Sequence, residues 1–305
     1  MKAHGKLGAI AVILLAVVLA FATCPVSAVD HGIDETWTYA VSTSVDVGEF
    51  VVDVSGNVTY EFEEERVIRV GTLGAREYNV NVIVMNGELS GTMELFGAPF
   101  LDASVVIDGF LYETAGGGGI VKEETSMLID ASVGSGSAWS AQYETQTVLT
   151  YNPPYLLGLN PESVEMGAQW WEFVVVNSAV TEWENGTAKG TTNGTLGEAY
   201  DVVVEPAADP TVTPAGAFDA FMITVTYESG DHEIRWWSDD VNGYVRIHFF
   251  SEGDDAARET MILTSYDRGD SESMLWVAMV GVAVALAAIV FLAVVLLRMR
   301  HTKSS

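Results

Sequence analysis

Residues Ile223–Glu228 read ITVTYE, and this short stretch is the clearest indication of the fold. Apolar side chains at positions 223, 225 and 227 alternate with polar ones, which is the pattern of a strand with one buried face. The same alternation occurs in Tyr78–Val84 and in Val245–Phe249. The sequence therefore predicts an all-β domain, built as a duplicated, curved antiparallel sheet that forms a half-barrel or a sandwich.

Glycine-containing turn signals separate the predicted strands. They are Ser55-Gly56-Asn57, Asn86-Gly87, Asp108-Gly109, Ser229-Gly230-Asp231 and Asn242-Gly243. The run Gly116–Gly119 predicts a flexible hairpin tip, because no Lys-Ser or Lys-Thr pair follows it as a phosphate-binding loop requires.

The first 28 residues predict a signal peptide. Two lysines precede an uncharged apolar run at Leu7–Phe21, and Val26-Ser27-Ala28 ends the segment with small residues. An uncleaved anchor is the alternative, but the run is shorter than the ~20 residues that span a bilayer. We therefore expect cleavage and export.

Met274–Leu297 predicts a transmembrane helix, because it contains no charged residue and is long enough to cross the hydrocarbon core. Arg298, Arg300 and Lys303 follow it, and cationic flanks stay in the cytoplasm. The predicted topology is a single-pass cell-membrane protein with its N-terminal domain outside. A short link at 269–273 precedes the helix, and the tail at 298–305 is cytoplasmic.

The predicted outer domain, residues 29–273, is strongly acidic. It carries nine of the 14 lysines and arginines and all 42 acidic residues. A field of this sign repels nucleic acid and anionic membrane surfaces, so we exclude a nucleic-acid partner. Once the signal is removed the chain has no cysteine, which excludes disulfides and thiol chemistry.

An internal repeat is suspected from two similar segments. The sequence GTLGAREYNVNV at Gly71–Val82 resembles GTLGEAYDVVV at Gly194–Val204, and each follows a strand that begins with a tryptophan, Trp37 or Trp171. Convergent strand composition is the alternative. Duplication would place the first β repeat at 29–160 and the second at 161–268.

The second half resembles extracytoplasmic envelope proteins that are half-open β-barrels, similar to lipoprotein carriers. The resemblance covers roughly residues 165–268 and depends on TPAGAFDA at Thr213–Ala220, EIRWWSDD at Glu233–Asp240 and VNGYVR at Val241–Arg246. It implies a curved sheet that holds an apolar or lipid-linked ligand on its concave face. This chain departs from those carriers in its predicted anchor, its duplication and its acidity. These departures argue against a shuttling role, because a carrier must diffuse.

Two tandem tryptophan pairs, Trp170-Trp171 and Trp236-Trp237, are the candidate ligand-binding residues. On a strand, one member of each pair faces the core and the other faces out. All four could instead belong to the core. The candidate glycosylation sites are the sequon asparagines Asn57, Asn185 and Asn193.

The sequence offers no catalytic residue set, metal site or cofactor motif that we can assign. The leading hypothesis is a membrane-anchored extracytoplasmic module that binds a lipid-like molecule, a glycan or an envelope protein. The first alternative is a structural, glycosylated acidic cell-surface protein without a small ligand. The second is a hydrolase that uses paired carboxylates.

Overall fold

The computed structural model describes residues 35–47, 50–71, 75–95, 98–115, 119–133, 139–155, 167–207, 209–241, 243–254 and 256–268. These residues form fourteen strands. The strands are β1 (Thr36–Val47), β2 (Phe50–Val70), β3 (Arg76–Leu95), β4 (Ala98–Thr114), β5 (Ile120–Val133), β6 (Ser140–Tyr155), β7 (Gln169–Glu184), β8 (Thr187–Pro206), β9 (Thr211–Thr213), β10 (Gly216–Phe218), β11 (Phe221–Tyr227), β12 (His232–Ser238), β13 (Gly243–Phe250) and β14 (Glu259–Asp267).

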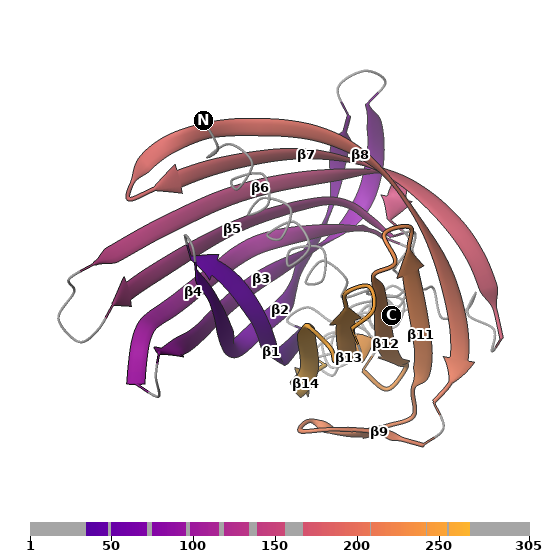
Figure 1. Cartoon of the computed structure of the whole chain (residues 1–305). Helices are drawn as coiled ribbons and strands as arrows, with labels where there is room; N and C mark the ends of the chain where they lie inside the picture. The colour runs from indigo at the N-terminus through magenta and orange to yellow at the C-terminus, as the bar shows by residue number, and fades with distance from the viewer. Residues whose placement is uncertain are drawn as a thin grey trace, which may run out of the picture.

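Twelve of these strands form one antiparallel barrel, so the predicted all-β class is confirmed. The order around the wall is β1-β14-β13-β12-β11-β8-β7-β6-β5-β4-β3-β2. Strand β1 pairs with β2 on one side and with β14 on the other, which closes the sheet (Figure 1). The arrangement is therefore a closed barrel, whereas the sequence predicts a half-barrel or a sandwich. The alternation within each strand does not indicate that the last strand pairs with the first.

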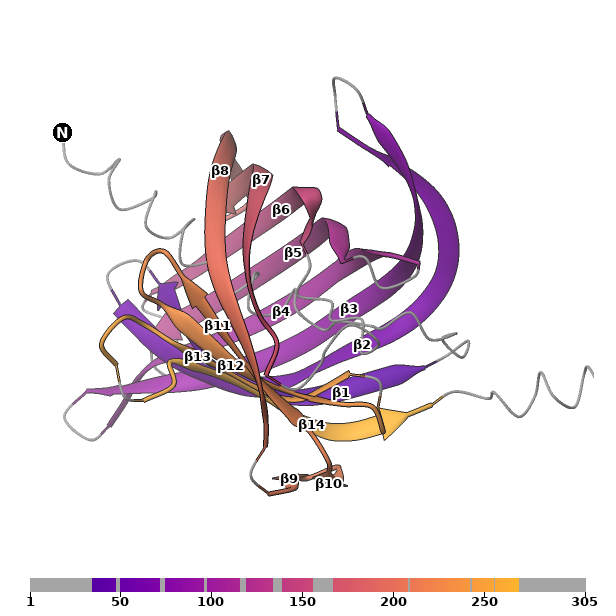
Figure 2. The ribbon, with the colours of Figure 1, turned by 90° about the vertical axis from the view of Figure 1, so that its right-hand side faces the viewer.

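The barrel wall is tall on one side and low on the other. Strands β2 to β8 contain 14 to 21 residues, whereas β11 to β14 contain seven to nine. Figure 2 shows the long strands rising beyond the short ones. The two-stranded hairpin β9–β10 lies outside the main sheet, between β8 and β11 in the chain.

Three of the five predicted turns are wrong, because Gly56, Gly87 and Gly109 lie within long strands. A Cβ atom on Gly56 would lie 2.0 Å from the carbonyl oxygen of Glu88 on the neighbouring strand. Glycine at this position permits a close approach of two backbones in a curved wall. Of the remaining two signals, Ser229-Gly230-Asp231 falls between β11 and β12, and Gly243 is the first residue of β13.

Side chains alternate between the barrel interior and its outer face, as the period of two predicted. The interior face of every barrel strand from β1 to β8 and β11 to β14 contributes to one core, with Trp37, Met85 and Ile107 among its residues. A second cluster, on the opposite face of the sheet, contains Val80, Val82, Tyr112 and Val121. Tyr78, Val80 and Val82 therefore belong to this outer cluster, whereas Ile83 faces the main core.

Both predicted halves contribute strands to this single barrel, and β6 pairs directly with β7. The matched positions of the suspected repeat face opposite sides of the sheet. Trp37 is buried in the core, whereas Trp171 is 63% exposed. Tyr78 packs in the outer cluster, whereas Tyr200 lies in the core. The duplication stays a prediction.

The two ends of the described chain lie side by side, because Thr36 of β1 pairs with Asp267 of β14. The predicted signal peptide at 1–28, the link at 269–273, the helix at 274–297 and the tail at 298–305 lie outside the described residues. Within the described ranges, no helix is long and apolar enough to cross a bilayer.

Candidate functional site

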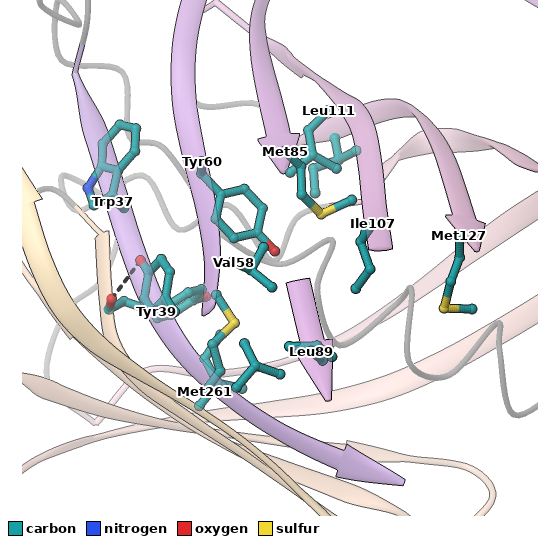
Figure 3. Packing of buried hydrophobic residues seen from close by; sticks show 14 of the residues in the cluster. Trp37, Tyr39, Val58, Tyr60, Met85, Leu89, Ile107, Leu111, Met127 and Met261 are labelled. Atoms are coloured by element: carbon teal, nitrogen blue, oxygen red, sulfur yellow. Dashed lines mark hydrogen bonds between the residues drawn. The ribbon is translucent and has the colours of Figure 1, made fainter. Parts of the chain in front are cut away.

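One part of the barrel interior is a wall of flexible and branched apolar side chains. It is formed by alternate residues of β3, β4 and β5, and Figure 3 shows several of them pointing into the same interior space. They include Met85, Leu89, Ile107, Met127 and Ile129. Methionine adapts its shape to irregular apolar partners, so this wall can accommodate apolar groups of varied form.

The other part of the interior is polar, which the apolar alternation of the strands does not predict. We define the interior polar cluster as Glu123 of β5, Tyr151 and Tyr155 of β6, Tyr227 of β11, and Glu233 and Arg235 of β12. Glu233 and Arg235 are two residues apart on one strand, so both face the interior. Their exposed fractions are 2% and 0%.

An ion pair forms the centre of this cluster. The Nε atom of Arg235 donates a hydrogen bond to Oε2 of Glu233 at 2.7 Å. Its Nη2 atom lies against the same oxygen as an ion pair without the alignment of a hydrogen bond. The Tyr227 hydroxyl donates to the other oxygen, Oε1, at 2.7 Å, and it lies 3.1 Å from the Tyr155 hydroxyl.

A second carboxyl group extends the cluster along β5 and β6. The Tyr151 hydroxyl donates to Oε2 of Glu123 at 3.2 Å, and the Thr125 hydroxyl donates to Oε1 at 3.1 Å. The rings of Tyr151 and Tyr155 stack with their centroids 5.4 Å apart. This stack joins the Glu123 end of the cluster to the Glu233–Arg235 end.

Burial controls the protonation of these groups. It raises the pKa of Glu123 to about 8, although the bonds from Thr125 and Tyr151 favour the ionised form. It also raises the pKa of the nearby Glu198 to about 6, and the charge of Glu233 adds to that rise. Burial alone would lower the pKa of Arg235, but Glu233 outweighs it and the pKa is well above its ordinary value. At neutral pH the ion pair of Arg235 with Glu233 therefore lies beside a largely protonated Glu123.

In the described part of the chain, one donor atom of Arg235 has neither a hydrogen-bond partner nor an ion-pair partner. The Nη1 atom of Arg235 is buried and has no hydrogen-bond partner among the described residues. The guanidinium carbon lies 5.4 Å from the centre of the Tyr244 ring, a cation–π contact that accepts no hydrogen bond in the guanidinium plane. An unsatisfied buried donor costs about 1–3 kcal/mol, and more when the group is charged. The cluster can therefore satisfy one further acceptor oxygen.

The four predicted tryptophans do not form one platform. Trp237 is in the core, and its Nε1 donates to Oδ1 of Asp239 at 3.1 Å. Trp170 is partly buried against the same core. Trp171 is exposed on the outer face, where it stacks on Phe173 with centroids 6.4 Å apart.

The remaining tryptophan lies on the outer face of the short strands. Trp236 is half-buried, with the Arg246 guanidinium 5.5 Å from its ring centre and the His248 ring 5.2 Å away. Each tandem pair thus places one member toward the core and one on the outer face. The structure brings Trp237 near the interior cluster through Tyr244, whose ring it contacts edge-on at 5.4 Å.

The interior cluster is the set of residues that sequence reasoning missed. The only local signal is the motif Glu233-Ile234-Arg235, an acid and a base on the same face of an amphipathic strand. The tyrosines and Glu123 come from strands far along the chain, so no spacing indicates them. Within the described part of the chain, no group of three or more metal-binding side chains is suitably placed for a metal ion.

The three sequon asparagines Asn57, Asn185 and Asn193 are all exposed in the structure. Comparisons with models of protein families, with curated proteins and with solved structures found no match for this chain. The resemblance to lipoprotein carriers therefore has no support outside the sequence motifs. The barrel geometry is the main guide to function.

Proposed function

We propose that this protein is a membrane-anchored extracytoplasmic binding module that holds a lipid-like amphiphile inside its barrel. The observation that carries the proposal is the buried, unpartnered Nη1 atom of Arg235 in an interior that is otherwise divided into an apolar wall and a polar cluster. An amphiphile matches both parts, because its tail buries apolar surface and its head supplies an acceptor.

The width of the barrel supports an interior ligand. Eight-stranded barrels enclose space that side chains fill or that holds one small ligand, and the diameter grows with strand number. This barrel has twelve strands. Apolar side chains of β3 to β5 line one part of the interior, which suits a hydrocarbon chain.

The charges favour an uncharged head group. Besides Arg235, the interior contains the carboxyl groups of Glu198, Glu233 and Glu259. An anionic head would be repelled by these groups in a poorly screened interior. An alcohol, ether or ester oxygen accepts a hydrogen bond from Nη1 without adding charge.

The predicted anchor would place the barrel where such ligands occur. Asp267, the last residue of β14, precedes the apolar segment 274–297 by only a few residues. Asp267 itself lies beside Thr36, the first residue of β1. A barrel held this closely to the bilayer would receive an amphiphile from the outer membrane surface instead of carrying it between membranes.

The test is native mass spectrometry of the full chain purified from its own membrane, followed by organic extraction and identification of the extract. We expect one class of neutral amphiphile to co-purify. The double variant Glu233→Leu/Arg235→Met removes both buried charges and should lower its amount about tenfold, because one charge-assisted hydrogen bond is lost.

The matched control is Glu184→Leu/Lys189→Met, which replaces the acid of an exposed ion pair by leucine and its base by methionine. It should leave the bound amphiphile unchanged. If no amphiphile co-purifies with the wild type, the proposal is wrong. If the interior double variant retains as much as the control, Arg235 does not bind the head group.

A second candidate function is a structural, acidic surface protein without a small ligand. The specific observation in its favour is the outer face of the long strands, where exposed carboxylates such as Glu88, Asp102 and Asp130 accompany exposed sequons. Such a surface is well solvated and repels like-charged neighbours. The same extraction experiment separates the two candidates, because this one predicts an empty interior.

A further inference from the structure

A polar groove crosses the outer face of β2 to β6. It consists of two adjacent hollows of about 770 and 660 Å³, which share Ser90 of β3 and Ser104 of β4. Many of the residues that line the hollows are glycine, alanine or serine. Ser132 and Ser140 continue the groove toward β6. Each hollow has the volume of a typical small-ligand site, which is roughly 300–1,000 Å³.

The groove offers fixed hydrogen-bonding groups. The Thr92 hydroxyl donates to Oδ1 of Asp102 at 2.8 Å, and Nε2 of Gln142 donates to Oδ1 of Asp130 at 2.9 Å. These cross-strand bonds hold the two carboxylates in place. Carboxylates accept hydrogen bonds from hydroxyl groups, and amides both accept and donate them. The negative charge of the carboxylates disfavours anionic ligands. The lining therefore suits a neutral, hydroxyl-rich molecule.

Two of the sequon asparagines line this groove. Asn57 of β2 lies in one hollow and Asn185 lies in the other. Asn193, in β8, is exposed but is not among the lining residues of either hollow. The sequence separates Asn57 from Asn185 by more than a hundred positions, and only the barrel brings both to one groove.

The geometry of Asn185 orients its side chain at the end of the groove. It occupies a two-residue turn with Gly186, and both residues have positive φ, 50° and 73°. Its backbone N–H donates to the carbonyl oxygen of Gln142 at 2.8 Å. Its Oδ1 accepts the backbone N–H of Gln142 at 3.0 Å. A glycan attaches through Nδ2, so the Oδ1 acceptor is retained after modification.

We propose that Asn185 carries a neutral oligosaccharide and that this oligosaccharide lies in the groove. In the attachment step, Nδ2 of Asn185 forms a bond to C1 of a sugar that is activated as a lipid-linked phosphate. The C1–O bond to the phosphate breaks with its electron pair on the phosphate, and Nδ2 loses one proton. The sugar hydroxyls then bond to the carboxylates and amides of the groove, which covers this part of the sheet.

The experiment uses the full chain isolated from its own membrane, with peptide mass mapping and mild periodate oxidation of sugar diols. The rate of periodate oxidation reports how accessible a glycan is, whatever its sugars are. We expect a glycan mass on Asn185 and oxidation about tenfold slower in the folded protein than in the urea-unfolded protein, since buried diols react only after local opening. Ser104→Trp fills the groove and should remove the protection while the glycan stays attached.

Two variants serve as controls. Thr187→Ala removes the sequon but keeps the Asn185 bond to Gln142, so the mass on Asn185 should disappear. Asn193→Gln removes a sequon outside the groove and should leave the protection of the Asn185 glycan unchanged. An unmodified Asn185 in the wild type overturns the inference. Equal oxidation rates in the folded and unfolded protein overturn it too, because the glycan would then extend into solvent.

Discussion

Replacing Arg235 by methionine removes one charge from a pair that has almost no contact with solvent. Arg235 is 0% exposed and Glu233 is 2% exposed, so the remaining carboxylate loses its counter-charge without gaining water. Breaking a buried pair in this way costs about 3–5 kcal/mol. The Tyr227 hydroxyl still donates to Oε1 of Glu233 at 2.7 Å, which favours the lower end of that range.

The double variant Glu233→Leu/Arg235→Met separates the loss of the pair from the burial of a lone charge. It leaves no ionised group at the centre of the cluster, and well-packed apolar replacements of a buried pair are often neutral or stabilising. We therefore expect the double variant to be more stable than Arg235→Met by at least about 2 kcal/mol.

The assay is urea unfolding of the full chain in mild detergent, followed by tryptophan fluorescence at neutral pH. The free energy of unfolding of the wild type, both single variants and the double variant completes a double-mutant cycle. If Arg235→Met and the double variant are destabilised equally, the cost does not arise from an uncompensated Glu233. A loss below about 1 kcal/mol for Arg235→Met would show that the site is solvated in solution.

Three further predictions use the same unfolding measurement. Burial raises the pKa of Glu123 from 4.5 to about 8, so the folded protein binds a proton that the unfolded chain releases, and stability should fall as pH rises between these values. Glu123→Gln should make this fall smaller, although buried Glu198 and Glu259 contribute to it as well, and an unchanged pH profile would contradict the assignment. Gly91→Ala would place a Cβ atom 1.8 Å from a carbonyl oxygen of β2, so it should lower the free energy of unfolding by about 1–3 kcal/mol or more. Gly194→Ala places its Cβ atom near only a rotatable serine hydroxyl, so the loss should be smaller. Trp237→Ala should lower the free energy of unfolding by about 3–5 kcal/mol, because this side chain is 1% exposed. Trp171 is 63% exposed, so Trp171→Ala should lower it by well under about 1 kcal/mol. Similar losses for the two variants would refute the two placements.

Local pattern was a good guide to the strands but a poor guide to their lengths. The alternation in Ile223–Glu228 correctly predicts β11, and the Gly230 signal correctly predicts the turn that follows. The same turn rule predicts turns at Gly56 and Gly87, although both lie inside long strands. A glycine relieves crowding between neighbouring backbones as well as forming turns, and the two uses look alike in sequence.

The tryptophan pairs show a similar limit. Alternation predicts that one member of each pair faces the core, and the structure places Trp237 and Trp171 on opposite sides of the sheet. Sequence cannot tell which outward aromatic would meet a ligand, because that depends on which strands become neighbours. Trp171 stacks on Phe173, whereas Trp236 lies beside Arg246 and His248 on another part of the wall.

The sequence by itself determines that this protein is an acidic β-protein, because both properties depend on composition and on a period of two along each strand. The tertiary structure alone decides that the sheet closes, that Glu123, Tyr155 and Arg235 share one buried cluster, and that Asn57 and Asn185 line one groove. The physical reason is pairing register. Each strand carries its own alternation, but the residues that meet across a barrel are set by which strands pair and by how far each is shifted.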